Sequence, residues 1–116
     1  MPLINRFAET HASLTEIRRD LHKHPELQFD CHRTANIIAK KLREWGCDDV
    51  KTGIGQTGVV GVIKGKTNSS GKVIGLRADM DALPIFEATG LPYTSKNEGK
   101  MHACGHDGHT TMLLGA

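Results

Sequence analysis

The sequence predicts an α/β domain in which helices come first and a mixed sheet with a hairpin follows. Two observations support this. Apolar residues recur at helical spacing through the first third of the chain, and two later runs, 57–64 (TGVVGVIK) and 72–78 (KVIGLRA), are rich in valine and isoleucine. Helices followed by strands and one more helix are typical of layered α/β domains.

The first helix is expected over residues 3–22. Its apolar residues are spaced about one helical turn apart, with charged residues between them: Ile4, Phe7, Ala8, Leu14, Ile17 and Leu21. Pro25 ends this helix, because the residue before a proline disfavours helical backbone angles.

A second helix follows. Asp30 is a residue type that caps helix N-termini, and Gly46 is a common stop signal. The apolar stripe between them consists of Ala35, Ile38, Leu42 and Trp45.

The pattern then changes to strands. We expect a short strand at 49–52, and an antiparallel hairpin formed by 57–64 and 72–78 around the turn sequence KTNSSG. Residues 84–100 contain two prolines and two glycines and predict a loop. A final helix is expected from near Asp107 through Leu114.

Composition narrows the functional class. The formal charge is +2 and no basic block is present, which argues against nucleic-acid binding. No stretch resembles a secretory signal or the ~20 apolar residues of a membrane span. The three cysteines include no Cys-x-x-Cys pair, so a disulfide framework is not expected. We therefore expect a cytoplasmic protein.

The stretch ACGHDGH carries the strongest chemical signal. Cys104 and His106 alternate along a loop and can face one cation, and thiolate with imidazole suits zinc and similar transition metals. Asp107 either caps the following helix or supports a histidine as a hydrogen-bond partner. Taken singly, His102 and His109 are interpreted as ordinary histidines rather than ligands.

Two further segments carry grouped polar residues. Asp79 and Asp81, in GLRADMDALP, lie on one face of a strand at its carboxyl end, where they either bind a ligand or only cap the strand. In DLHKHPELQ, the residues His22 and His24 are possible ligands, but a structural role is favoured for His24 and Glu26.

In this order, LHKHPEL, GLRADMDALP and MHACGHDGHTTMLLGA resemble the di-metal aminoacylase and carboxypeptidase-type amidohydrolases. The resemblance is to the branch of hippurate hydrolases and N-acyl-amino-acid deacetylases, and it extends from about Ile17 to Ala116. It implies a three-layer α/β/α metallopeptidase-like catalytic domain that hydrolyses the amide bond of N-acyl amino acids at two divalent metal ions.

The resemblance also implies roles for single residues. Cys104 and His106 match metal ligands of this branch, and the thiolate favours manganese, nickel or zinc. Asp81 matches an aspartate that supports the metal and base geometry, so it is the catalytic candidate. Asp79 stands where related branches carry a ligand histidine, which leaves its role open.

The general base of this family is a glutamate beyond the Cys-Gly-His motif, past the last residue of this chain. We therefore expect residues 1–116 to be the N-terminal part of a catalytic domain, without a second domain and inactive in isolation. We also expect a small-molecule substrate, no nucleic-acid or membrane partner, and a homo-oligomer. The alternative is a small metal-binding module in which His102, Cys104, His106 and His109 hold a structural ion.

Overall fold

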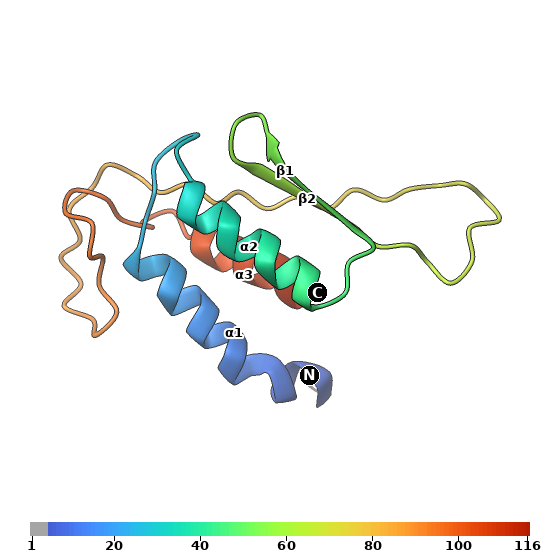
Figure 1. The fold of residues 1–116 in the computed structure, drawn as a ribbon. Helices are drawn as coiled ribbons and strands as arrows, with labels where there is room; N and C mark the ends of the chain where they lie inside the picture. The colour runs from blue at the N-terminus through green and yellow to red at the C-terminus, as the bar shows by residue number, and fades with distance from the viewer. Residues whose placement is uncertain (1–4) are drawn as a thin grey trace.

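The computed structural model describes residues 5–116 and has the mixed α/β composition that the sequence predicts. The elements in chain order are α1 (Asn5–Lys23), α2 (His32–Glu44), β1 (Asp49–Ile54), β2 (Gly58–Val62) and α3 (His106–Gly115). Helix α1 packs against α3, while α2 packs against both strands (Figure 1).

The two long helices form close to where they are predicted. The described part of α1 ends at Lys23, one residue beyond the predicted end, and the predicted start at residue 3 lies outside the described residues. Ile17 and Leu21 are the apolar residues that α1 buries. Gly46, with φ +88°, follows the last turn of α2 and adopts the left-handed conformation that glycine tolerates best.

The predicted cap of α2 is wrong. Asp30 does not cap this helix; Cys31 occupies the capping position and makes no side-chain capping bond. Instead, the carboxylate of Glu26 accepts hydrogen bonds from the backbone N–H groups of Arg33 (2.9 Å) and Thr34 (2.7 Å). A carboxylate at a helix N-terminus satisfies free N–H groups and complements the helix dipole, so a distant residue performs the capping function.

The predicted hairpin is also wrong in its partners. β1 pairs with β2 in antiparallel register, with Asp49 opposite Val62 and Ile54 opposite Gly58. The turn between them has positive φ at Gly55 (+54°) and Gln56 (+87°), as tight hairpin turns with the twist of their strands require. This turn joins β1 to β2, whereas the predicted hairpin joined 57–64 to 72–78 through KTNSSG.

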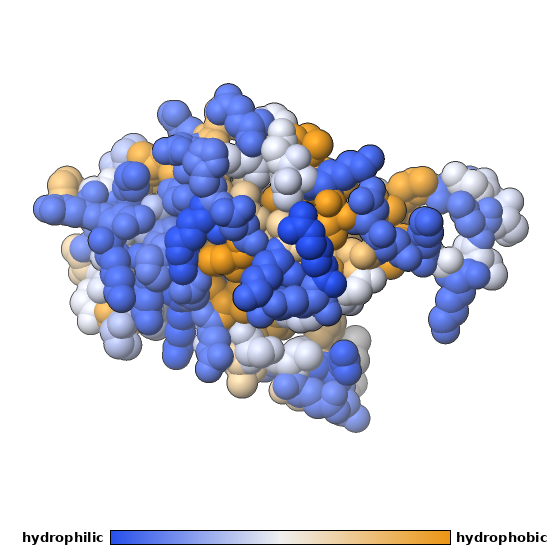
Figure 2. All heavy atoms as spheres, in the orientation of Figure 1, coloured by the Kyte–Doolittle hydropathy of each residue, from blue (hydrophilic) through white to orange (hydrophobic). Residues whose placement is uncertain are grey.

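Residues 72–78 run without a strand partner among the described residues, and the loop before them projects from the layers (Figure 1). An apolar groove of about 830 Å³ is lined both by β2 and by this segment. The side chains lining it include Leu42, Val59, Ile74, Leu76, Leu113 and Leu114. Figure 2 shows part of the exposed hydrophobic surface, including atoms at the base of the projecting loop.

Short backbone contacts connect the remaining segments. Leu27 pairs with Ala82 in a parallel bridge and Leu83 with Met101 in an antiparallel bridge. The backbone N–H of Lys96 donates to the carbonyl of Lys23, which fixes the 84–100 loop against the end of α1. Within residues 5–116, no helix is long and apolar enough to cross a membrane.

Replacing Glu26 with alanine is expected to destabilise the protein by about 1–2 kcal/mol, because two N–H groups of α2 lose their acceptor. Urea unfolding followed by circular dichroism measures the change. The control is Glu44→Ala, which removes only the longer ion pairs to Lys40 and Lys41 and should cost less than about 0.5 kcal/mol. Equal losses in the two variants would contradict the capping role.

Candidate metal centre

His106, the first residue of α3, contacts both aspartates of the Asp-Met-Asp segment. Its Nδ1 lies 3.0 Å from Oδ1 of Asp81, and its Nε2 lies 3.5 Å from Oδ2 of Asp79. The preceding Gly105 adopts φ +91°, a left-handed conformation that starts the helix abruptly after the loop. The structure thus brings His106 and Asp81, two predicted site residues, into direct contact.

His109 joins this cluster from the next turn of α3. Its Nδ1 lies 2.7 Å from Oδ1 of Asp79, and its ring stacks on that of His106 with centroids 5.5 Å apart. The hydroxyl of Thr110 donates to the backbone carbonyl of Asp79 (2.8 Å), which fastens this residue to the helix. One donor atom from each of Asp79, His106 and His109 lies within 4.8 Å of the others, a spacing that suits a single metal ion.

The charge of Asp79 is stabilised by its neighbours. The hydrogen bond from His109 is the main cause that holds the pKa of Asp79 below its usual range, and the charges of His106 and His109 act in the same direction. Burial opposes them but is the weaker effect. Asp79 is therefore a carboxylate at neutral pH and supplies an anionic oxygen to the cluster.

Cys104 and His102 lie differently from the three clustered residues. Cys104 is exposed, and it belongs to no group with metal-ligand spacing among the described residues. His102 is buried and neither ring nitrogen has a hydrogen-bond partner in the protein. Desolvation is the main cause that lowers the pKa of His102, although the charge of Asp107 acts in the opposite direction.

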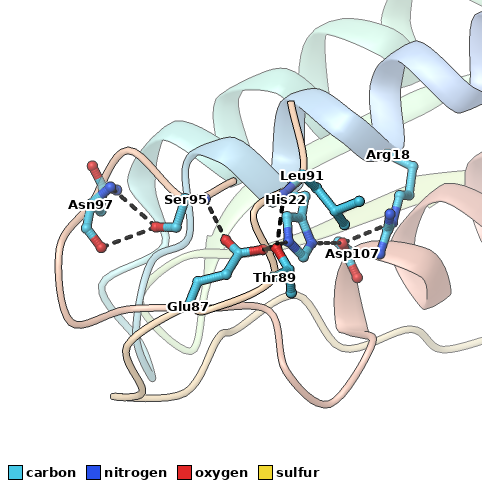
Figure 3. A network of polar contacts seen from close by, with 8 residues as sticks. All are labelled: Arg18, His22, Glu87, Thr89, Leu91, Ser95, Asn97 and Asp107. Carbon is cyan, nitrogen blue, oxygen red and sulfur yellow. Dashed lines mark hydrogen bonds and ion pairs between the residues drawn. The ribbon is translucent and has the colours of Figure 1, made fainter. Parts of the chain in front are cut away.

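A second polar cluster joins the end of α1 to the start of α3 (Figure 3). The ring of His22 lies between two carboxylates: Nδ1 is 2.8 Å from Oδ2 of Asp107, and Nε2 is 2.7 Å from Oε1 of Glu87. Arg18 reaches the same oxygen of Asp107 at 2.9 Å. We call Arg18, His22, Glu87 and Asp107 the buried ion cluster.

Sequence reasoning missed this cluster. His22 was only a possible ligand, Asp107 had two alternative roles, and Glu87 carried no signal in a stretch predicted as loop. Burial tends to raise the pKa of Glu87, but hydrogen bonds from His22, Ser95 N–H and Thr89 outweigh it and hold the pKa below its usual range.

The residues of the first cluster lie in a segment that matches a known protein family. The family described as peptidase family M20/M25/M40 matches residues 75–116, which include Asp79, Asp81, Cys104, His106 and His109. The hippurate hydrolase of Campylobacter jejuni is 56% identical over 98% of this chain. The chain is therefore similar to peptidase family M20 over residues 75–116.

Two further proteins are similar to the chain, one in sequence and one in both sequence and fold. An N-acetylcysteine deacetylase of Bacillus subtilis is 48% identical over 90% of the chain. A Bacillus subtilis crystal structure, described as a dinuclear metal-binding peptidase of family M20, superposes with a TM-score of 0.84 at 44% identity over 92% of the chain. The chain spans 29%, 27% and 29% of the lengths of these three proteins, respectively.

The lowered pKa values of Asp79 and Glu87 predict acid sensitivity. When a carboxyl group has a lower pKa folded than unfolded, its contribution to stability is complete above the unfolded pKa, about 4, and is lost as the pH falls through the folded value. Urea unfolding between pH 3 and 7 should therefore show a shallower acid loss in Glu87→Gln than in the unchanged protein. The exposed Glu44→Gln should keep the original slope, and an unchanged slope in Glu87→Gln would refute the prediction.

The cysteines are expected to differ in reactivity. Burial, helped by the negative charges of Glu26, Asp81 and Asp30, raises the pKa of the Cys31 thiol to about 11. The thiol also donates hydrogen bonds to backbone carbonyls. Cys104 is exposed. Iodoacetamide at pH 8 should label Cys104 first and leave Cys31 unlabelled until urea is added, as peptide mass mapping will show. Labelling of native Cys31 at the rate of Cys104 would contradict this assignment.

Proposed function

We propose that this chain forms part of the metal centre of an enzyme that hydrolyses the amide bond of N-acyl amino acids, including hippurate-like substrates. The observation that carries the proposal is the 56% identity with a hippurate hydrolase along 98% of the chain. The deacetylase similarity supports the same reaction class, because removing an acyl group from an amino acid is also amide hydrolysis.

The donor atoms of this chain fit divalent metal ions. Imidazole nitrogens, a carboxylate and a nearby exposed thiol are the ligand types that zinc, nickel and manganese share. We propose Cys104 and His106 as ligands in a centre of two ions, as in the dinuclear relative. Asp79 and His109 lie close enough to contribute to the same centre.

The bound ions would polarise the scissile carbonyl and lower the pKa of an attacking water toward ~7. The residues of this chain orient that centre. Asp81 accepts a hydrogen bond from Nδ1 of His106, which leaves Nε2 directed toward the cluster. This hydrogen bond also makes the ring a stronger electron-pair donor to a metal ion. In this role Asp81 supports catalysis through His106.

The net charge and an apolar groove bear on the partners of the enzyme. A formal charge of +2 supports a small-molecule substrate rather than a nucleic acid. We propose that the enzyme acts in the cytoplasm as a homo-oligomer, and the apolar groove beside β2 supplies a surface that could be covered on association.

One observation favours a second function, a metal-binding module without catalysis. Asp79, His106 and His109 bring three donor atoms within 4.8 Å using two segments of this chain alone. This set differs from the predicted structural site, because it contains Asp79 in place of His102 and Cys104.

Metal titration separates the two functions. The amidohydrolase centre predicts that Cys104→Ser and His106→Ala each weaken zinc binding at least about tenfold, because each removes a ligand. The control is His32→Ala, which removes an exposed histidine paired only with Asp30. Native mass spectrometry and calorimetry measure the bound ions. The metal-binding module predicts instead that Cys104→Ser has no effect and that Asp79→Asn abolishes binding.

Hydrolysis decides the enzymatic claim. A polypeptide that contains this chain and has the full length of its relatives should hydrolyse N-benzoylglycine in the presence of manganese, and His106→Ala should reduce the rate at least about a hundredfold. Residues 1–116 alone should be inactive or nearly so. A complete polypeptide that binds metal but leaves N-benzoylglycine and N-acetylcysteine intact would overturn the proposal.

A further inference from the structure

The ring of His22 lies at the centre of the buried ion cluster. The side chains of His22, Glu87 and Asp107 are 4%, 3% and 0% exposed, and each ring nitrogen of His22 faces a carboxylate oxygen (Figure 3). A neutral imidazole has one N–H and can donate to only one of the two carboxylates. Each ring nitrogen nevertheless lies within hydrogen-bond distance of a carboxyl oxygen, so the ring of His22 bridges Asp107 and Glu87.

The polar groups of the cluster are paired with one another. Arg18 and His22 both contact Asp107, and His22 also contacts Glu87. Asp107 also accepts a hydrogen bond from the backbone N–H of Gly108, and Glu87 accepts from Thr89 and from the backbone of Ser95. Buried ions require such pairing and hydrogen bonding, but the net stability that they add is small, so geometric specificity is the better explanation for them.

The geometry that this cluster fixes is that of the first turn of α3. Asp107 follows His106 directly, and consecutive residues of a helix point about 100° apart. Asp107 therefore reaches toward α1 while His106 reaches toward Asp79 and Asp81. Gly105, the capping residue of α3, has no side chain to cap the first turn, so the restraints on α3 come from Asp107 on one side and from the contacts of His109 and Thr110 with Asp79 on the other.

We propose that His22 is a positioning residue of the metal centre, an inference that rests on the proposed function. By bridging Asp107 and Glu87, the ring fixes the rotation of α3 and connects this helix to the 84–100 loop. The ring of His106 is thereby held with Nδ1 on Asp81 and Nε2 toward the ligand position. His22 itself touches no donor of the proposed centre.

Histidine side-chain ¹⁵N NMR on the metal-free protein tests this proposal directly. In the unchanged protein, His106 should carry its proton on Nδ1, which faces Asp81. In His22→Gln, one amide replaces the two ring nitrogens, so Asp107 and Glu87 are no longer bridged. The His106 signals should then move toward the average of the two tautomers, and the zinc dissociation constant should rise about tenfold.

The matched control is Leu21→Ala, which removes a fully buried apolar side chain from the neighbouring position of α1 and should destabilise the fold at least as much. If His22→Gln does not fold, Glu87→Gln tests the same bridge: it keeps the side-chain shape, removes one charge, and should shift the His106 signals in the same direction by a smaller amount.

A change in His106 that occurs in His22→Gln but not in Leu21→Ala supports the positioning role. Equal His106 signals in the two variants would overturn it and leave His22 as a purely structural residue. Absence of zinc binding in the unchanged protein would refute the proposed function separately, because the tautomer comparison is made without metal.

Discussion

The contact between Asp107 and the end of α1 is the interaction on which the rest of the structure depends. Few apolar side chains are fully buried in the described residues, and buried polar groups are as numerous as apolar ones. Helices α1 and α3 are therefore joined largely by ion pairs and hydrogen bonds centred on His22. These contacts are directional, so they define the orientation of α3 more narrowly than apolar packing alone would.

Glu26 plays a comparable part for the second helix. Its carboxylate holds the N-terminus of α2, while its backbone carbonyl accepts a hydrogen bond from Ala82 (2.7 Å), directly after the Asp-Met-Asp segment. A single residue thus aligns α2 with the segment that carries Asp79 and Asp81. The turn between α1 and α2 therefore also helps to place the candidate site.

Helices could be predicted from sequence because their signals are local. The apolar spacing in α1 and α2 and the glycine at 46 act within a few residues. Strand pairing depends on distant segments, and the Val/Ile composition of 72–78 does not specify a partner. The competing turn at Gly55 and Gln56 decided the hairpin, and it was missed because a non-glycine residue adopts positive φ there.

Part of the candidate site could likewise be predicted from the sequence, and part could not. His106 and Asp81 could be recognised from motifs, and the structure brings them together. The contact of His109 with Asp79 could not be predicted, because it depends on the rotation of α3 relative to a segment thirty residues earlier. Glu87 had no sequence signal for the further reason that its partner, His22, lies sixty-five residues away.

The extended segment 72–78 has a consequence for the behaviour of the chain in solution. Val73, Ile74 and Leu76 are 91%, 86% and 71% exposed, and the backbone between them pairs with no strand of the described residues. Such a segment is a template for strand addition by another extended chain. Lys72 and Arg77 flank it and oppose close pairing of like copies through charge repulsion. Ionic strength, which screens that repulsion, therefore governs how readily the chain aggregates.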